Sequence, residues 1–155
     1  MQKRKIMFVC LGNICRSPMA ELLCRDMLEK AGRAEEFEVQ SSGTSSENIF
    51  NGVGARVYAP VRVLLEEKGI SCEGKRAQVL TSAHGEAFDL LLCMDSANVR
   101  NAQRIVGEKN AHKCKKLLSF AGENGDVADP WYSDRFDIAY QDIYEGCVAL
   151  LEKLK

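Results

Sequence analysis

The chain has 155 residues, of which 46% are hydrophobic and 28% are charged, and its formal net charge is -1. This length fits one domain, residues 1–155, with a sizeable core, and the distributed apolar residues argue against intrinsic disorder. A charge so close to zero gives no reason to expect binding to nucleic acid. No apolar run approaches the length of a membrane-spanning helix, so we expect no membrane partner either.

Cysteine and histidine usage bears on the compartment and on metal binding. The chain contains seven cysteines and two histidines. An odd number of cysteines without a framework spacing is typical of a reducing cytosol, so we expect a cytoplasmic protein. Since no Cys-x2-Cys pair occurs, a zinc site is unexpected, and we expect neither a metal nor another cofactor. The basic start, MQKRK, precedes an apolar run that is too short for a signal peptide.

The hydrophobic pattern predicts strands that alternate with helices. The expected strands cover residues 5–9, 38–41, 89–94 and 115–118, and the expected helices cover residues 18–31, 60–68, 96–105 and 133–154. This alternation indicates an α/β fold with three layers, in which a four-stranded, parallel, twisted sheet carries helices on both faces. Ligands of such sheets bind beyond the carboxyl ends of the strands.

The junction between the first strand and the first helix, Ile6 to Pro18, reads IMFVCLGNICRSP. Ser17 is placed to cap the helix, and Pro18 suits its first position. A strand, a tight loop and a helix start in this order predict an anion site. The loop N–H groups and the unpaired N–H groups of the first helical turn point to one spot, which the helix dipole makes positive.

Cys10 and Arg16 stand at the two ends of this loop. A thiol beside these donors and a guanidinium should lose its proton easily. The same groups would hold a dianionic phosphate ester, with Arg16 binding two oxygens. The alternative is that Cys10 and Cys15 are small buried residues beside an ordinary turn, as most lone cysteines are. A glycine, Asn13, Arg16 and a hydroxyl within the same turn favour the functional interpretation.

The segment CLGNICRSP, from Cys10, resembles the phosphate loop of the low-molecular-weight protein tyrosine phosphatases, whose pattern is Cys, five residues, Arg, Ser. A second segment, Asp129-Pro130-Trp131-Tyr132, is similar to the family's acid loop near the C-terminus. The two motifs at this separation make the resemblance span essentially the whole chain. It implies the phosphotyrosine protein phosphatase I-like fold and a metal-independent hydrolysis of aryl phosphate monoesters.

The resemblance also implies a role for each motif residue. Cys10 would attack phosphorus and form a phosphocysteine, Arg16 would clamp the phosphate, and Asp129 would serve as general acid and then as base. Further residues would bind the phosphate or wall the substrate, namely Leu11, Gly12, Asn13, Ile14, Cys15, Ser17, Trp131 and Tyr132. The alternative for Asp129 is a turn-starting carboxylate, and the alternative for the aromatic pair is partial core burial.

Supporting roles follow from the same resemblance. Ser17 would hydrogen-bond the Cys10 thiolate, although simple N-capping would also explain a serine there. Asn13, which tolerates positive φ, would shape the loop and bond to Ser41. Asp95 would support the site or cap the helix that begins after it.

Cys15 matches a second loop cysteine of many family members. It would form a reversible disulfide with Cys10 that protects the nucleophile from over-oxidation. The alternative is an inert buried thiol.

Two segments depart from the family pattern. Ser45, Ser46, Glu47 and Asn48 stand where many members carry an aromatic substrate wall, which Phe50 or Tyr58 would have to replace. The segment 74–78, GKRAQ, lacks the His of the family's His-x-Ala-Arg-Gln, so the hydrogen-bond network must be completed differently. Both changes bear on substrate affinity and choice more than on the chemistry.

Other functions on related scaffolds remain open. Protein arginine phosphatases typically carry Thr where Ile14 stands, and the apolar Ile14 favours an aryl phosphate. Arsenate reductases need two further cysteines close together, whereas Cys72 and Cys93 are far apart in sequence. A phosphopeptide-binding module would have lost Cys10 or Asp129, and a phosphocysteine carrier would not need the acid loop. We expect a monomer that binds a phosphotyrosyl protein or a small aryl phosphate, and inorganic phosphate or a similar oxyanion in the loop.

Overall fold

The computed structural model describes residues 2–155. Its main sheet has four parallel strands in the order β2-β1-β5-β6. These strands are β1 (Arg4–Cys10), β2 (Phe37–Gly43), β5 (Leu90–Cys93) and β6 (Cys114–Lys116). Each of the four strands overlaps one of the predicted strand ranges. The expected α/β fold with a four-stranded parallel sheet is confirmed.

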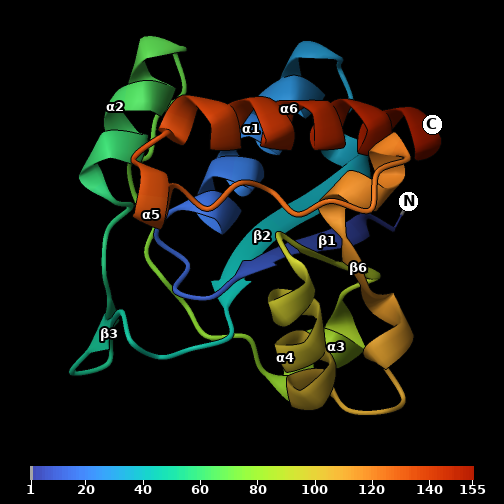
Figure 1. Cartoon of the computed structure of the whole chain (residues 1–155). Coiled ribbons are helices and arrows are strands. Elements are labelled where there is room, and N and C mark those ends of the chain that lie inside the picture. The colour runs from blue at the N-terminus through green and yellow to red at the C-terminus, as the bar shows by residue number, and fades with distance from the viewer. Residues whose placement is uncertain (1) are drawn as a thin grey trace.

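Helices cover both faces of this sheet, as Figure 1 shows. One face packs against α1 (Arg16–Lys30), α2 (Ala59–Glu67) and α6 (Phe136–Lys153), and the other against α3 (Ser82–Ala87) and α4 (Ser96–Val106). Because side chains alternate along a strand, Ile6 and Phe8 of β1 enter the first core whereas Met7 and Val9 enter the second. The central strand is thus buried on both sides, as its apolar run requires.

The last helix starts later than predicted. The sequence pattern predicts one helix over residues 133–154, but the chain forms a short helix, α5 (Pro130–Ser133), and then α6. Asp134 separates the two helices because it adopts a left-handed conformation with φ 58°. This break keeps the acid loop apart from the long helix.

Three further elements differ from the prediction or were missed by it. The last strand ends at Lys116, and residues 117–118 belong to a 3₁₀ turn instead. Neither α3 nor the hairpin of β3 (Ile49–Phe50) and β4 (Val53–Gly54) was predicted. These segments are short, and α3 depends on a capping box between Thr81 and His84 that the periodicity of apolar residues does not reveal.

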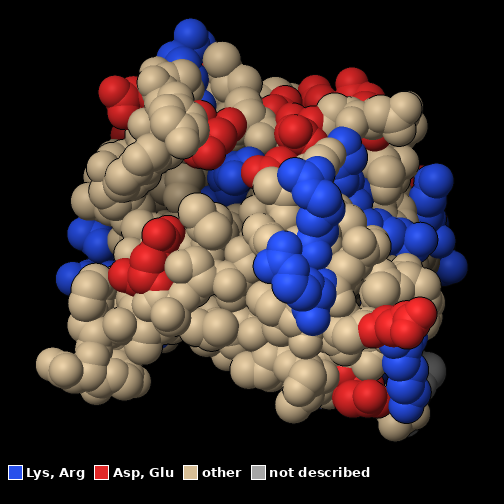
Figure 2. Space-filling model, turned by 60° about the horizontal axis from the view of Figure 1, so that its bottom comes forward, with Lys and Arg blue, Asp and Glu red and all other residues tan. Residues whose placement is uncertain are grey.

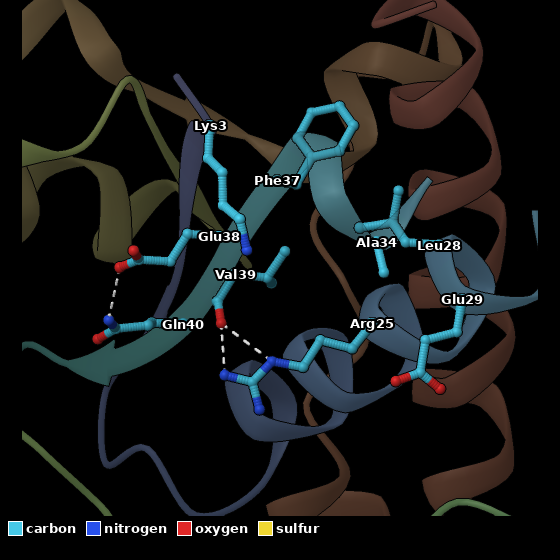
Figure 3. A pocket seen from close by; sticks show the side chains of 9 residues that line it. All are labelled: Lys3, Arg25, Leu28, Glu29, Ala34, Phe37, Glu38, Val39 and Gln40. Atoms are coloured by element: carbon cyan, nitrogen blue, oxygen red, sulfur yellow. Dashed lines mark hydrogen bonds between the residues drawn. The ribbon is translucent and has the colours of Figure 1, made fainter. Parts of the chain in front are cut away.

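The edge strand β2 is tied to α1 by an arginine, as Figure 3 shows. Arg25 donates from Nε and Nη2 to the carbonyl oxygen of Val39, at 3.1 and 2.6 Å. The surrounding pocket, lined among others by Lys3, Phe37 and Glu38, includes the amino-terminal part of β2. It shares no lining residue with the pocket at the carboxyl ends of the strands.

The surface is mixed in charge. Figure 2 shows lysine and arginine side chains in separate groups on one face, with acidic and uncharged residues between them. Within residues 2–155, no helix combines the length and the hydropathy needed to cross a membrane.

Candidate active site

Strand β1 delivers Cys10 to the carboxyl edge of the sheet, where the chain turns back into α1. The loop between them bends around the Cys10 sulfur, and Asn13 takes the expected left-handed conformation with φ 56°. The Asn13 N–H donates to Cys10 Sγ at 3.3 Å. A backbone donor of the loop and the first turn of α1 therefore face the thiol, which is the arrangement that stabilises an anion.

The start of α1 differs from the prediction. The helix begins at Arg16, with Cys15 as its N-cap residue and no capping side chain, so Ser17 lies inside the first turn. Instead of capping, the Ser17 hydroxyl lies 2.9 Å from Cys10 Sγ and accepts from Asn13 Nδ2 at 2.7 Å. The loop wraps so tightly that the serine contacts the thiol rather than the end of its own helix.

Arg16 is held from two sides by groups that follow other strands. Its Nη2 donates to Asp95 Oδ2 at 2.9 Å, and its Nη1 donates to the carbonyl oxygen of Val127 at 3.0 Å. Asp95 also caps α4 by accepting the Asn98 N–H at 2.7 Å, so both roles considered for it are present. The guanidinium is thus fixed beside the loop before any ligand arrives.

Asp129 stands at the mouth of the loop. Its side chain is 42% exposed, and Oδ2 lies 3.8 Å from Arg16 Nη2. Its other oxygen accepts the Trp131 N–H at 3.0 Å and caps α5, so it does start a turn. One carboxylate oxygen therefore positions the acid loop while the other faces Arg16.

Most of the residues named from the sequence meet in one pocket, whereas Ser17, Ser41 and Asp95 lie outside its lining. Its lining consists of Cys10, Leu11, Gly12, Asn13, Ile14, Cys15, Arg16, Glu47, Asn48, Asp129, Trp131 and Tyr132. The two aromatic residues of this set are 64% and 87% exposed, so neither is a core residue. An open, partly aromatic mouth above a thiol suits a flat substrate.

Behind the loop lies a polar network that the sequence analysis found only in part. The expected bond from Asn13 to Ser41 is present, at 2.9 Å. Ser41 donates in turn to Glu21 Oε1 at 2.6 Å, and Lys75 Nζ lies 2.9 Å from the same oxygen. Glu21 was missed, although its place on the buried stripe of α1, four residues after Ser17, was a signal, because a carboxylate there requires a partner.

All seven cysteines are free thiols. Burial raises the pKa of Cys15 to about 12, with a smaller contribution from the neighbouring Cys10. Cys15 is therefore a protonated thiol at neutral pH, and its disulfide with Cys10 stays a prediction. Among the described residues 2–155, no group of three or more His, Cys, Asp or Glu side chains is placed to hold a metal ion.

Comparison with known proteins identifies the family. The family model "Low molecular weight phosphotyrosine protein phosphatase" matches residues 5–155. The chain belongs to this family of cysteine-based phosphatases. It is 34% identical to the low-molecular-weight protein-tyrosine-phosphatase YfkJ of Bacillus subtilis over 97% of this chain and 95% of the relative.

Solved structures agree with this assignment. The crystal structure of YfkJ superposes with a TM-score of 0.92 at 32% identity, covering 99% of this chain and 96% of that one. A protein tyrosine phosphatase from Entamoeba histolytica has a TM-score of 0.88 at 26% identity, covering 98% and 97%. The Drosophila arginine phosphatase DARP has a TM-score of 0.87 at 26% identity, covering 97% and 98%. The same scaffold therefore occurs in proteins named tyrosine phosphatase and in one named arginine phosphatase.

The two departures from the phosphatase pattern have structural counterparts. Glu47 and Asn48 occupy the wall where an aromatic residue was missing, and Asn48 Nδ2 donates to the Gly12 carbonyl oxygen at 3.0 Å. Tyr58 does not line the pocket itself but packs against Trp131, with ring centroids 5.7 Å apart. This wall is therefore polar and acidic, and Tyr58 supports the aromatic residue Trp131.

The absent histidine is replaced by two contacts from the same segment. The Gln78 N–H donates to Asn13 Oδ1 at 2.9 Å. Lys75 reaches further in and binds both Glu21 and the Ser41 carbonyl oxygen, the latter at 3.2 Å. The network behind the phosphatase loop is thus closed by a lysine and a backbone amide.

Gly43 at the end of β2 allows the loop after β1 to pack directly against the backbone of this strand. A Cβ at this position would lie 2.6 Å from the Leu11 carbonyl oxygen and 3.2 Å from the Asn13 nitrogen. We expect Gly43→Ala to displace the loop and lower phosphatase kcat/KM by about a hundredfold, since small misplacements of reacting groups are that costly. Assays with an aryl phosphate measure this loss. Gly125→Ala, where a Cβ would contact nothing within 4 Å, should keep wild-type activity. Equal activity of the two variants would contradict the steric argument.

Proposed function

We propose that this protein hydrolyses phosphotyrosine through a phosphocysteine intermediate. The observation that carries the proposal is the position of Cys10 Sγ, which faces the Asn13 N–H and the Ser17 hydroxyl at the foot of the pocket. In the first step the Cys10 thiolate attacks phosphorus and the bond from phosphorus to the phenolic oxygen breaks. Arg16 and the loop N–H groups stabilise the charge on the equatorial oxygens.

Asp129 handles the protons in both steps. It gives a proton to the leaving phenolate, then accepts one from the water that attacks the phosphocysteine and releases inorganic phosphate. Its place supports this role, because it stands at the exposed mouth of the pocket beside Arg16. The Ser17 hydroxyl would stabilise the thiolate both as nucleophile and as leaving group.

The aromatic wall and Ile14 favour an aryl phosphate. Trp131 and Tyr132 offer flat faces for a phenyl ring, and Ile14 offers no hydroxyl to a guanidinium. An arsenate reductase is less well supported, because Cys72 belongs to the core on one face of the sheet and Cys93 to the core on the other. Two thiols so placed cannot relay a disulfide with Cys10.

Release of phosphate from a phosphotyrosine peptide, without metal and with reductant, tests the proposal. We expect turnover that Cys10→Ser abolishes and that Asp129→Asn lowers by about 10²- to 10⁴-fold, the usual contribution of a general acid. A phosphoarginine peptide run in parallel tests the role of Ile14. Turnover of phosphoarginine alone would overturn the tyrosine assignment, and saturable binding without turnover would indicate a phosphopeptide-binding module.

Glu47 should bias the choice of peptide. Its carboxylate lies against the loop, since a Cβ on Gly12 would be 3.0 Å from Glu47 Oε1. The charged residues that line the pocket are Arg16, Glu47 and Asp129, so the rim around the phosphate seat is acidic. We expect a peptide with lysine beside the phosphotyrosine to give a kcat/KM about two- to fivefold above that of a glutamate analogue, the range of an exposed ion pair.

Two variants and one small substrate check this preference. Glu47→Gln should remove it, whereas Glu35→Gln, an exposed carboxylate in a 3₁₀ turn before β2, should not. Turnover of p-nitrophenyl phosphate, which has no flanking residue, should be the same in all three proteins. A preference that survives Glu47→Gln would show that another group reads the flanking charge.

We further propose that Cys15, which lines the same pocket as Cys10, protects the nucleophile. Mild peroxide would convert the Cys10 thiolate to a sulfenic acid, and the Cys15 thiol would displace water to give a disulfide. Free thiols throughout the chain fit the cytoplasmic setting that we propose. We expect mass spectrometry to find the Cys10–Cys15 disulfide in the wild type and a Cys10 sulfinate in Cys15→Ser. A persistent Cys10 sulfinate in the wild type, without that disulfide, would exclude this role.

A further inference from the structure

A buried ion cluster lies behind the phosphate loop, outside the pocket. The Glu21 and Lys75 side chains are 3% and 10% exposed, and Lys75 Nζ lies 2.9 Å from Glu21 Oε1. Arg25 Nη1 contacts the other carboxylate oxygen at 2.8 Å, and the same arginine holds the edge of β2 (Figure 3). A buried ion pair is weak evidence for stability, because its desolvation offsets its attraction. The cluster therefore calls for another explanation.

A continuous chain of hydrogen bonds connects this cluster with the Cys10 sulfur. Ser41 Oγ bonds to Glu21 Oε1 at 2.6 Å. Asn13 Nδ2 lies 2.9 Å from Ser41 Oγ and 2.7 Å from Ser17 Oγ. Ser17 Oγ then lies 2.9 Å from Cys10 Sγ. Four bonds thus join a buried carboxylate to the thiol.

The chemistry of the groups sets the direction of the bonds that lead from Glu21 to the Ser17 oxygen. The Glu21 carboxylate forms ion pairs with Lys75 and Arg25, and the oxygens of an ion-paired carboxylate can only accept. Ser41 must therefore give its one proton to Glu21, and its oxygen can only accept from Asn13. The Asn13 carbonyl accepts the Gln78 N–H, so its amide donates to both serines. Ser17 accepts from Asn13. Its one proton faces two acceptors, Cys10 Sγ at 2.9 Å and the more distant Ser42 carbonyl oxygen at 3.5 Å.

We propose that Lys75 and Glu21 form a positioning pair that fixes this direction, so that Ser17 donates to the Cys10 thiolate. Without the carboxylate, Ser41 could turn its proton elsewhere, and the Gln78 N–H would oppose a reversed Asn13 amide without help from Ser41. The oxygen of a reversed amide would compete for the Ser17 proton. The charged or titratable groups that share the pocket with the thiol are Cys15, Arg16, Glu47 and Asp129, and Cys93 lies near it from β5. The importance of the thiolate for turnover rests on the proposed function.

The test removes both charges together, because removing one would leave the other buried and unpaired. In Glu21→Leu/Lys75→Met, alkylation of Cys10 by iodoacetamide is followed by mass spectrometry of the Cys10 peptide between about pH 5 and pH 9, around the range where a thiol titrates. We expect alkylation at the acidic end to be about tenfold slower, the effect of losing one hydrogen bond to a charged group. The acid limb of the kcat/KM profile should move to higher pH with it.

Two further variants separate positioning from general damage. The control Asp26→Asn/Lys30→Gln removes another ion pair of α1, one whose Lys30 side chain is 72% exposed. This variant should keep the wild-type alkylation profile. Ser41→Ala cuts the chain while leaving the ion pair, so alkylation should slow by a similar factor. In the Ser41→Ala background, removing the pair should cause no additional slowing, because the two changes break the same chain.

A folded double variant with the wild-type alkylation profile would overturn the proposal. If circular dichroism shows that the double variant does not fold, the test rests on Ser41→Ala. An alkylation profile of Ser41→Ala equal to that of the wild type would then contradict the proposal. Alkylation of Cys10 needs no turnover. A wild-type protein without phosphatase activity would therefore contradict the proposed function and leave this test intact.

Discussion

The structure depends on one local constraint, the convergence of hydrogen-bond donors on a single sulfur atom between a strand and a helix. A chain can turn this tightly only if Asn13 accepts a left-handed conformation and Gly43 of the next strand leaves room for the loop. The helix must also begin at once, at Arg16. The result is a site in which the Asn13 N–H, the Ser17 hydroxyl and the first turn of α1 converge on the Cys10 sulfur.

The parallel sheet supplies the remaining parts because the carboxyl ends of its strands share one edge. Asp95 follows β5 and orients Arg16, and the segment that follows β6 brings the Val127 carbonyl oxygen and Asp129 to the same guanidinium. None of these groups is near Cys10 in sequence. The fold therefore holds these groups in place around the guanidinium. Stabilising charge on the equatorial oxygens of a transferring phosphoryl group requires such a preassembled environment.

Local patterns in the sequence were sufficient to predict that the loop from Cys10 to Arg16 and the segment 129–132 belong to one site, because each is a contiguous motif. The predictions were wrong where a conformation or a distant partner decides, as at Asp134, whose left-handed backbone divides the last helix. Of the two roles expected for Ser17, the hydrogen bond with Cys10 is present and the helix cap is not, because the tight loop turns the hydroxyl toward the sulfur. Lys75 and Glu21 are separated by 54 residues, so only the tertiary structure reveals their pairing.

The measurement that tests the central claim most directly is a search for the covalent intermediate. Rapid acid quenching of the reaction with a phosphotyrosine peptide, followed by mass spectrometry under conditions that preserve the thiophosphate bond, locates any transferred phosphate. We expect it on Cys10, since that sulfur lies at the foot of the pocket. Turnover with phosphate on another residue, or with none on Cys10 under conditions that preserve a phosphocysteine standard, would contradict the account.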